Sequence, residues 1–138
     1  MKIRKMSHGD HGELKDCDES LIDKVLTAAT HVHNQLGPGL LESVYELALM
    51  IELSRAGISA QRQVEIPVNY RGQELGVGFR ADIMVADSLL LEIKSVDDFK
   101  PVHLAQIMTY LKLIGLKRGY LLNFNTKLLK DGIKRVSI

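Results

Sequence analysis

The run LLLEIKSV, residues 89–96, is the feature that most restricts the fold of this chain. Three leucines, an isoleucine and a valine within eight residues are typical of a strand that is buried in a core. The run also contains Glu92 and Lys94, and burial of charge is costly unless each charge has partners. Side chains two residues apart on a strand point to the same side of a sheet. The sequence therefore predicts a buried strand that carries both charges on one face.

The spacing of apolar residues in the rest of the chain predicts a single α/β domain with a mixed sheet. Pro67 suggests an edge strand or a bulge, and RG at 71–72 a hairpin turn. The last apolar strand directly follows a helix, so we expect it to be parallel to its neighbour. Residues 130–138 are compatible with a turn and a final strand. The expected elements are helices at 19–36 and about 40–55, strands at 64–70, about 74–85 and 89–96, a helix from Pro101 to about 114, and a strand at 118–125.

The composition excludes several classes of protein. A length of 138 residues with 46% apolar residues matches one domain with one core, and a net charge of +1 points to no partner. Cys17 is the only cysteine, which excludes an intrachain disulfide and fits the reducing cytoplasm, where we expect the protein to be located. No segment approaches the roughly 18 apolar residues of a membrane span, so no membrane partner is expected.

The first 18 residues differ from the rest of the chain. They are polar and lack the apolar region of a signal peptide. We therefore expect residues 1–18 to be a flexible tail and residues 19–138 to form the domain. His8, Asp10 and His11 could contact a metal, but a flexible tail is the favoured interpretation.

Asp82 is expected to lie across from Glu92. ADS at 86–88 predicts a tight turn, and each acid is five residues from Asp87 at its centre, although a slip of one residue would separate them. Two adjacent carboxylates repel each other but tolerate a divalent cation between them, and oxygen ligands suit Mg²⁺. Lys94 would offset negative charge, hold a phosphate or orient a metal-bound water. The alternative is a plain Glu–Lys ion pair on a half-exposed strand.

Polar residues on two of the helices could complete such a site. Glu42 lies near the start of the second helix, with Tyr45 and Glu46 near the same face. An acidic first turn that the helix dipole favours is the simpler explanation, and a third carboxylate facing the metal is the functional one. Gln106 and Tyr110 are four residues apart and lie off the apolar stripe of their helix, either on a solvated face or beside the site.

The C-terminal segment is basic. Residues 111–138 contain seven basic residues against one acid. A solvated surface explains this on its own, and a surface that binds polyanions is the sharper interpretation.

Taken together, these residues resemble a known family. Asp82, the Glu92–Ile93–Lys94 tripeptide and the Gln106/Tyr110 pair, in this order of elements, resemble the PD-(D/E)XK nuclease superfamily, with Ala81 where the family name has proline. GPGLLESVYE is similar to the signature of its GxxExxY branch, with Gly39, Glu42 and Tyr45 at the named positions, and the resemblance covers about residues 19–136.

The resemblance implies a restriction-endonuclease-like core, in which three antiparallel strands and one parallel strand are flanked by helices. It implies that Asp82, Glu92, Glu42 and the Ile93 carbonyl bind Mg²⁺, with Mn²⁺ as a substitute, and that Lys94 positions or helps to deprotonate the attacking water. Gln106, Tyr110 and Tyr45 would support the site or contact nucleic acid.

The function that we expect is a Mg²⁺-dependent nuclease in which Asp82, Glu92, Lys94 and Glu42 are catalytic. DNA is favoured over RNA, and a homodimer or a larger assembly is expected for a chain this small. Two alternatives stay open. One is a non-catalytic module that keeps the nuclease fold and binds nucleic acid or a protein, and the other is a structural ion-pair network.

Overall fold

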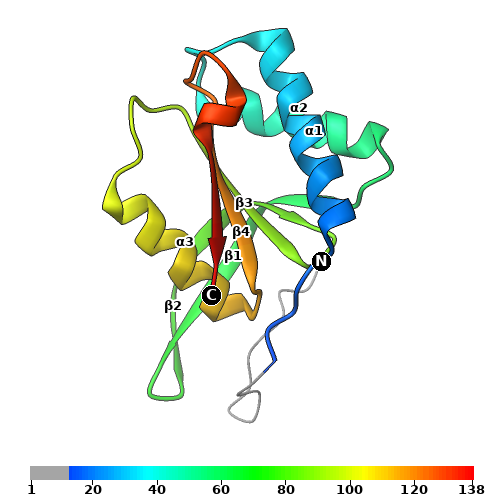
Figure 1. The fold of residues 1–138 in the computed structure, drawn as a ribbon. Helices are drawn as coiled ribbons and strands as arrows, with labels where there is room; N and C mark the ends of the chain where they lie inside the picture. Colours follow the sequence, from blue (N-terminus) through cyan, green and yellow to red (C-terminus); the bar gives the residue numbers. More distant parts are fainter. Residues whose placement is uncertain (1–12) are drawn as a thin grey trace.

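A five-stranded mixed sheet lies at the centre of the structure, a computed structural model that describes residues 13–138 (Figure 1). Strands β3 and β4 are parallel, and every other neighbouring pair is antiparallel. This arrangement confirms the predicted antiparallel meander and parallel strand, and the final strand with which residues 130–138 are compatible is present as a fifth strand. In spatial order the strands are β1 (Ala60–Tyr70), β2 (Gln73–Val85), β3 (Leu89–Lys94), β4 (Arg118–Asn123) and β5 (Ile133–Ser137).

The helices cover both faces of this sheet. Helices α1 (Glu19–Leu36) and α2 (Glu42–Arg55) lie on one face, and α3 (Pro101–Ile114) lies on the other (Figure 1). Within β3, Leu91 and its alternate neighbours belong to the core beneath α1 and α2, whereas Leu90 belongs to the core beneath α3. Both faces of β3 are therefore buried, which explains its nearly continuous apolar sequence.

Local sequence signals set the ends of the helices. The Asp18 side chain accepts a hydrogen bond from the Leu21 N–H (2.7 Å), which caps the start of α1. Gly37, with φ of 70°, follows its last residue. Pro101 occupies the first turn of α3, and Gly115 ends that helix in the left-handed conformation. The predicted bounds of α1 and α3 are confirmed, while α2 begins at Glu42 rather than near residue 40.

The strands also follow the predicted turns. Arg71 and Gly72, with φ of 50° and 82°, connect β1 to β2, and the register shifts just after Pro67, as expected for a bulge. Ala86 and Asp87 both have positive φ in the β2–β3 turn. The β1–β2 hairpin extends beyond the sheet (Figure 1). Compared with the predicted ranges, β1 begins earlier, at Ala60, and β3 and β4 end earlier, at Lys94 and Asn123. A 3₁₀ helix, η1 (Leu129–Gly132), precedes β5.

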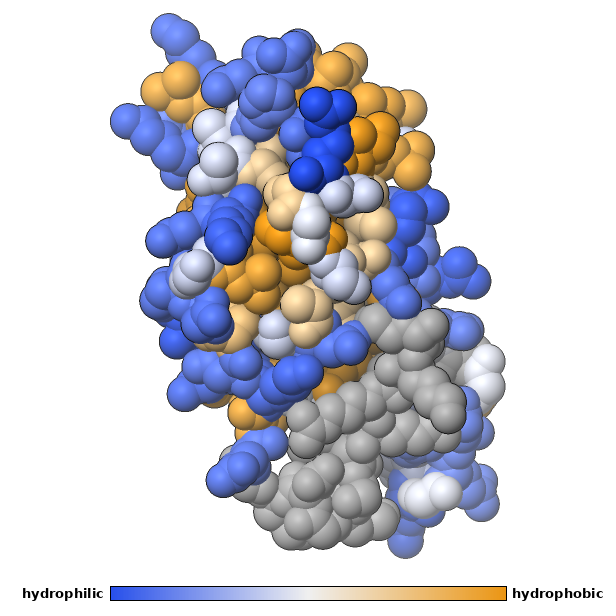
Figure 2. Space-filling view, turned by 90° about the vertical axis from the view of Figure 1, so that its right-hand side faces the viewer, coloured by the Kyte–Doolittle hydropathy of each residue, from blue (hydrophilic) through white to orange (hydrophobic). Residues whose placement is uncertain are grey.

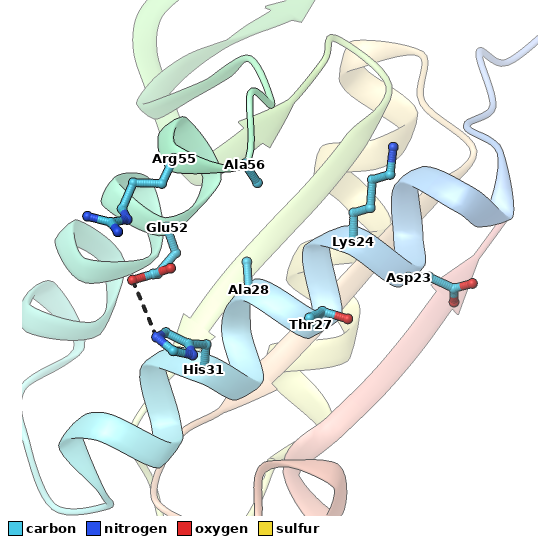
Figure 3. A pocket seen from close by; sticks show the side chains of 8 residues that line it. All are labelled: Asp23, Lys24, Thr27, Ala28, His31, Glu52, Arg55 and Ala56. Atoms are coloured by element: carbon cyan, nitrogen blue, oxygen red, sulfur yellow. Dashed lines mark ion pairs between the residues drawn. The ribbon is translucent and has the colours of Figure 1, made fainter.

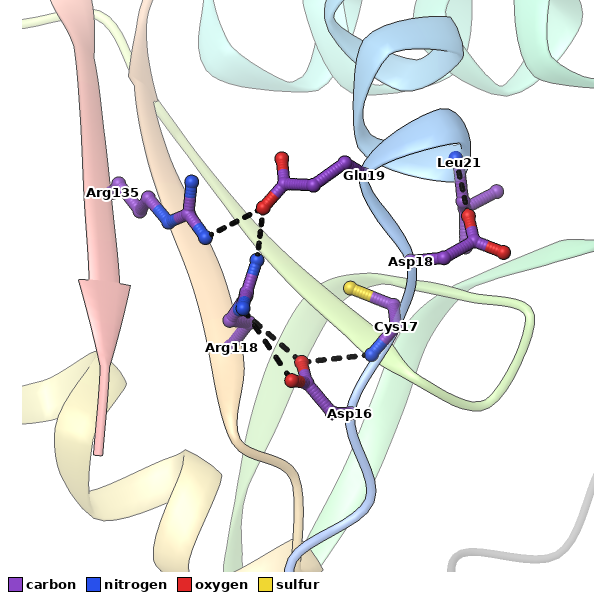
Figure 4. A network of polar contacts seen from close by, with 7 residues as sticks. All are labelled: Asp16, Cys17, Asp18, Glu19, Leu21, Arg118 and Arg135. Carbon is purple, nitrogen blue, oxygen red and sulfur yellow. Dashed lines mark hydrogen bonds and ion pairs between the residues drawn. The ribbon is translucent and has the colours of Figure 1, made fainter.

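Part of the predicted N-terminal tail is docked on the sheet. Arg118 of β4 forms ion pairs with Asp16 (3.2 Å) and Glu19 (2.6 Å), and Arg135 of β5 also contacts Glu19 (2.9 Å) (Figure 4). Lys15 forms a parallel bridge with Leu116. Residues 1–12, with His8, Asp10 and His11, lie outside the described residues.

Among residues 13–138, no helix is long and apolar enough to cross a membrane. Figure 2 shows the side of the molecule that α1 and α2 cover, with apolar surface in its middle and upper right and hydrophilic side chains around it. An apolar stripe along α2 is exposed, and it consists of Leu41, Val44, Leu47 and Ile51.

Candidate functional site

The two acids predicted to face each other lie where β2 and β3 separate. The last pair of their ladder is Ile83 with Leu91, and the same register places Asp82 across from Glu92. The Asp82 N–H donates to Glu92 Oε2 (2.7 Å), and the Ile93 N–H donates to Asp82 Oδ2 (2.7 Å). Each carboxylate therefore accepts a hydrogen bond from the backbone of the opposite strand. The side chains thus connect the two strands beyond the last pair of their ladder.

The electrostatics of this acid pair oppose its ionisation. Burial, and then the negative charge of Asp82, raise the pKa of Glu92 from 4.5 to about 8. A hydrogen bond between the two carboxyl groups also favours the protonated form of Glu92. Burial raises the pKa of Asp82 as well, and the charges of Glu46 and Glu42 add to this effect. Without a bound cation, the site therefore favours a protonated Glu92 at neutral pH.

Lys94 favours the ionised form of both acids. Its positive charge lowers the pKa of both acids, although burial has the larger effect on each. Lys94 is half-buried at the end of β3, and strand alternation places it on the same face as Glu92. The structure thus brings Asp82, Glu92 and Lys94 together.

Glu42 lies at the margin of the site. Its Oε2 atom accepts a hydrogen bond from the Ser95 N–H (3.0 Å), and the Ser95 hydroxyl donates to the Leu40 carbonyl (2.7 Å). These bonds connect the start of α2 to the residue that follows Lys94. Across residues 13–138, however, no three His, Cys, Asp or Glu side chains gather closely enough to hold a metal ion. Glu42 is therefore near Asp82 but not grouped with both acids as a third ligand, which differs from the prediction.

Glu46 is a site residue that the sequence analysis did not select. It is buried, and its carboxylate accepts hydrogen bonds from Arg62 (2.5 Å) and from Gln63 (2.8 Å). The negative charge of Glu46 raises the pKa of Asp82, and its effect is larger than that of Glu42. The spacing of four residues from Glu42 was the only sequence signal for it.

Tyr45 fixes the loop that precedes α2. Its hydroxyl donates to the Gly37 carbonyl (2.6 Å) and accepts from the Leu40 N–H (3.0 Å). Its ring is fully buried and stacks on Phe124 at a centroid distance of 4.5 Å. The geometry therefore matches a supporting role for Tyr45, and the ring offers no surface to nucleic acid.

Gln106 and Tyr110, the two residues selected on α3, differ in their exposure to solvent. Gln106 is exposed, whereas Tyr110 is buried in the core beneath α3, so a solvated face, one of the two predicted alternatives, is wrong for Tyr110. Burial, followed by the charges of Glu92 and Asp82, raises the pKa of Tyr110. The phenol thus lies close to both acids.

Asn123 and His103 also border the site. The Asn123 side chain accepts from the Val96 N–H (3.1 Å) and donates to the Val96 carbonyl (2.8 Å), which fixes the loop after β3. Burial, and then the positive charge of Lys94, lower the pKa of His103. Its Nδ1 atom accepts from the Lys100 N–H (3.0 Å) at the start of α3.

The donor set suits a divalent cation that prefers oxygen ligands. Two largely buried carboxylates meet where their charges repel each other, and a cation between them would lower both raised pKa values. Ile93 lies beside them, and a role for its carbonyl stays a prediction. The side chains of Asp82 and Glu92 therefore fit a divalent cation of this kind.

Ion pairs reduce the positive charge of the basic surface predicted for residues 111–138. Arg118 and Arg135 are engaged with Asp16 and Glu19, so two of the seven basic residues are neutralised (Figure 4). The exposed residues that remain are Lys112, Lys117, Lys127, Lys130 and Lys134.

A separate pocket of about 440 Å³ lies between α1 and α2 (Figure 3). It contains charges of both signs, and His31 Nε2 lies 3.9 Å from Glu52 Oε1 across it. None of the acids described above lines this pocket, so it is distinct from the site at β2 and β3. Its lining residues are Asp23, Lys24, Thr27, Ala28, His31, Glu52, Arg55 and Ala56.

Comparisons with known proteins concern the family and the fold of this chain. A crystal structure of a protein named SSO0001 is similar, with a TM-score of 0.50 and 24% sequence identity over 87% of this chain, and this likeness concerns the fold. The match covers 58% of that protein, so the present chain spans less than two thirds of its length. A search of curated proteins finds no match. The family model of the PD-(D/E)XK nuclease superfamily matches residues 19–136. This chain therefore belongs to the PD-(D/E)XK nuclease superfamily, and its mixed sheet flanked by helices is consistent with a restriction-endonuclease-like fold.

Proposed function

We propose that this protein is a metal-dependent nuclease of the GxxExxY branch that hydrolyses phosphodiester bonds, with DNA as the favoured substrate. The observation that carries the proposal is the pair of carboxylates where β2 and β3 separate. Glu92 is buried and Asp82 half-buried, both have raised pKa values, and Lys94 lies beside them. If these acids served only in structural ion pairs, their pKa values would be expected to be lowered, because each carboxylate would have a cationic partner.

The residues would divide the chemistry among them. Asp82 and Glu92 would hold Mg²⁺ or Mn²⁺, with the Ile93 carbonyl as a further ligand. The bound ion would supply an acidified water and positive charge for the phosphate oxygens. Lys94 would donate a hydrogen bond that orients the attacking water or a phosphate oxygen.

The surrounding residues would support this arrangement. Glu42, which accepts a hydrogen bond from the Ser95 N–H, would accept a proton or complete the metal site. Tyr110 borders the acids, and Gln106 is exposed one turn before it on α3. The unpaired lysines of residues 111–138 would contribute contacts to the phosphate backbone without reading its sequence.

A cleavage assay tests the proposal. Single- and double-stranded DNA and RNA oligonucleotides would be incubated with Mg²⁺ or Mn²⁺, and in parallel with a chelator. We expect cleavage that requires the metal and falls about 100-fold or more in Asp82→Asn and in Lys94→Met. Asp87→Asn, which changes an exposed acid in the turn of the same hairpin, should cleave like the parent protein.

The absence of a group of three acids within residues 13–138 favours one alternative, a non-catalytic binding module. Such a module would retain nucleic acid in a salt-sensitive manner without cutting it. If the acids formed only a structural ion-pair network, Asp82→Asn would lower the melting temperature, and the parent protein would show no metal-dependent shift.

The expectations of a cytoplasmic location and of a homodimer or larger assembly also stay proposals. The apolar stripe on α2, Leu41, Val44, Leu47 and Ile51, supports assembly because exposed apolar patches commonly mark contact surfaces. Light scattering would measure the mass in solution.

A further inference from the structure

We propose that Phe79 is a stacking platform for one unpaired base of the substrate, so that the site accepts single-stranded or locally opened nucleic acid in preference to a continuous duplex. This inference rests on the proposed function, because it specifies the substrate class of the same site.

The position of Phe79 is the first reason. Phe79 lies on β2, three residues before Asp82, and is 42% exposed. Its ring lies 5.3 Å from that of Tyr110 between centroids, at an angle of 37°. Tyr110 belongs in turn to the core beneath α3 together with Leu90, and strand alternation puts Glu92 on the same face of β3 as Leu90. An exposed aromatic ring therefore adjoins the acids through one buried ring.

The support beneath Phe79 is the second reason. Phe79 pairs with Ile66 of β1, and an added Cβ at the neighbouring Gly78 would lie only 2.5 Å from the Ile66 carbonyl oxygen. The backbone is thus closely fitted to its partner strand at this point. Tyr110 contacts the ring on the side of α3, while much of the ring stays open to solvent. A ring held on a strand and supported by a second ring is preorganised for binding.

The chemistry of the ring identifies the ligand. Every nucleic-acid base has a flat π-face, and stacking on an aromatic side chain is favourable and tolerant of sequence. Within a continuous duplex these faces are already stacked on neighbouring bases. A base can therefore reach Phe79 only from a single strand, a frayed end or an opened segment.

Substitution at Phe79 tests the inference by binding alone. A single-stranded DNA oligonucleotide and a duplex of the same sequence would be titrated with Ca²⁺ in place of Mg²⁺. We expect Phe79→Ala and Phe79→Leu to weaken binding of the single strand about 5- to 100-fold and binding of the duplex less than twofold. Tyr70→Ala is the matched control, because Tyr70 is a 64% exposed aromatic on the same hairpin but at its far turn. It should bind both forms like the parent protein.

Fluorescence gives a second measurement that does not depend on affinity. The chain has no tryptophan, so Phe79→Trp introduces a single reporter. We expect the single strand to quench its emission by stacking, whereas Tyr70→Trp should be unaffected. If Phe79→Ala does not fold, Phe79→Leu and Phe79→Trp still decide the outcome.

Several results would overturn the inference. These are equal weakening of both nucleic-acid forms, unchanged binding in Phe79→Leu, unquenched emission from Phe79→Trp, or a parent protein that does not bind single strands. Neither measurement requires cleavage. If the single strand quenches Phe79→Trp but the parent protein cuts nothing in the cleavage assay, the nuclease proposal is refuted and the stacking platform is retained. If the parent protein cuts but Phe79→Trp is not quenched, the stacking platform is refuted and the nuclease proposal is retained.

Discussion

At the scale of single residues, Glu92 connects the stability of the protein to pH. Its pKa is about 8 in the folded protein, against an ordinary value of 4.5. Between these values the folded protein holds a proton that the unfolded chain has released. Without metal, the free energy of unfolding should therefore fall as pH rises from about 4.5 to about 8, by at most about 1.4 kcal/mol per pH unit for one proton.

The variant Glu92→Gln should flatten this slope, because the amide does not titrate. Part of the slope should remain, since the pKa of Asp82 is raised in the same direction. Urea unfolding in a chelating buffer at several pH values would measure how the free energy of unfolding depends on pH. Asp87→Asn is the control, and it should keep the slope of the parent protein. An unchanged slope in Glu92→Gln would contradict the assigned cause.

At the scale of elements, the start of α2 depends on Tyr45. Tyr45→Phe removes the hydroxyl that bridges the Gly37 carbonyl and the Leu40 N–H, so we expect a loss of about 1 kcal/mol of stability. Because Glu42 follows this loop, cleavage should also decrease, by a few-fold. Thermal melting and the cleavage assay would measure both effects. Tyr70→Phe, at an exposed tyrosine, should change stability by less than about 0.5 kcal/mol.

The sequence predicted the elements well where the signal is local. Pro101 at the start of a helix and the period of apolar residues act over a few positions, and the bounds of α1 and α3 were correct. The turn around Asp87 also set the register of β2 and β3, because a tight turn leaves few ways to pair the strands it connects. The burial of Tyr110 was not predicted, because the buried face of α3 is wider than the stripe of its aliphatic residues.

At the scale of the whole molecule, β3 is the centre of stability. Leu91 is fully buried in the core beneath α1 and α2, so Leu91→Ala should cost about 2–5 kcal/mol. Leu75→Ala removes the same atoms from a residue on the protruding hairpin that is 50% exposed, and should cost less than about 0.5 kcal/mol. Chemical denaturation would compare the two variants, and equal losses would contradict the central place of β3.

Long-range contacts limited what the sequence could predict about the site. Ser95 meets Glu42 across 53 positions, and Asn123 meets Val96 across 27. Glu46 has its partners on β1, and no periodic pattern indicates such pairs. The Asp82, Glu92 and Lys94 group was accessible because a single hairpin creates it, whereas its surroundings arise only when α2, β3 and β4 come together.

The hydrogen bonds that the two acids make with opposite strands also determine how variants should be interpreted. Alanine at Asp82 or Glu92 would remove the ionisable group and, at the same time, a hydrogen bond between the two strands. Asparagine and glutamine keep an oxygen that can accept the same N–H, so they retain the contact between the strands and remove only the ionisable group. We therefore expect any relative that has lost catalysis but kept its shape to carry amides at these two positions rather than apolar residues.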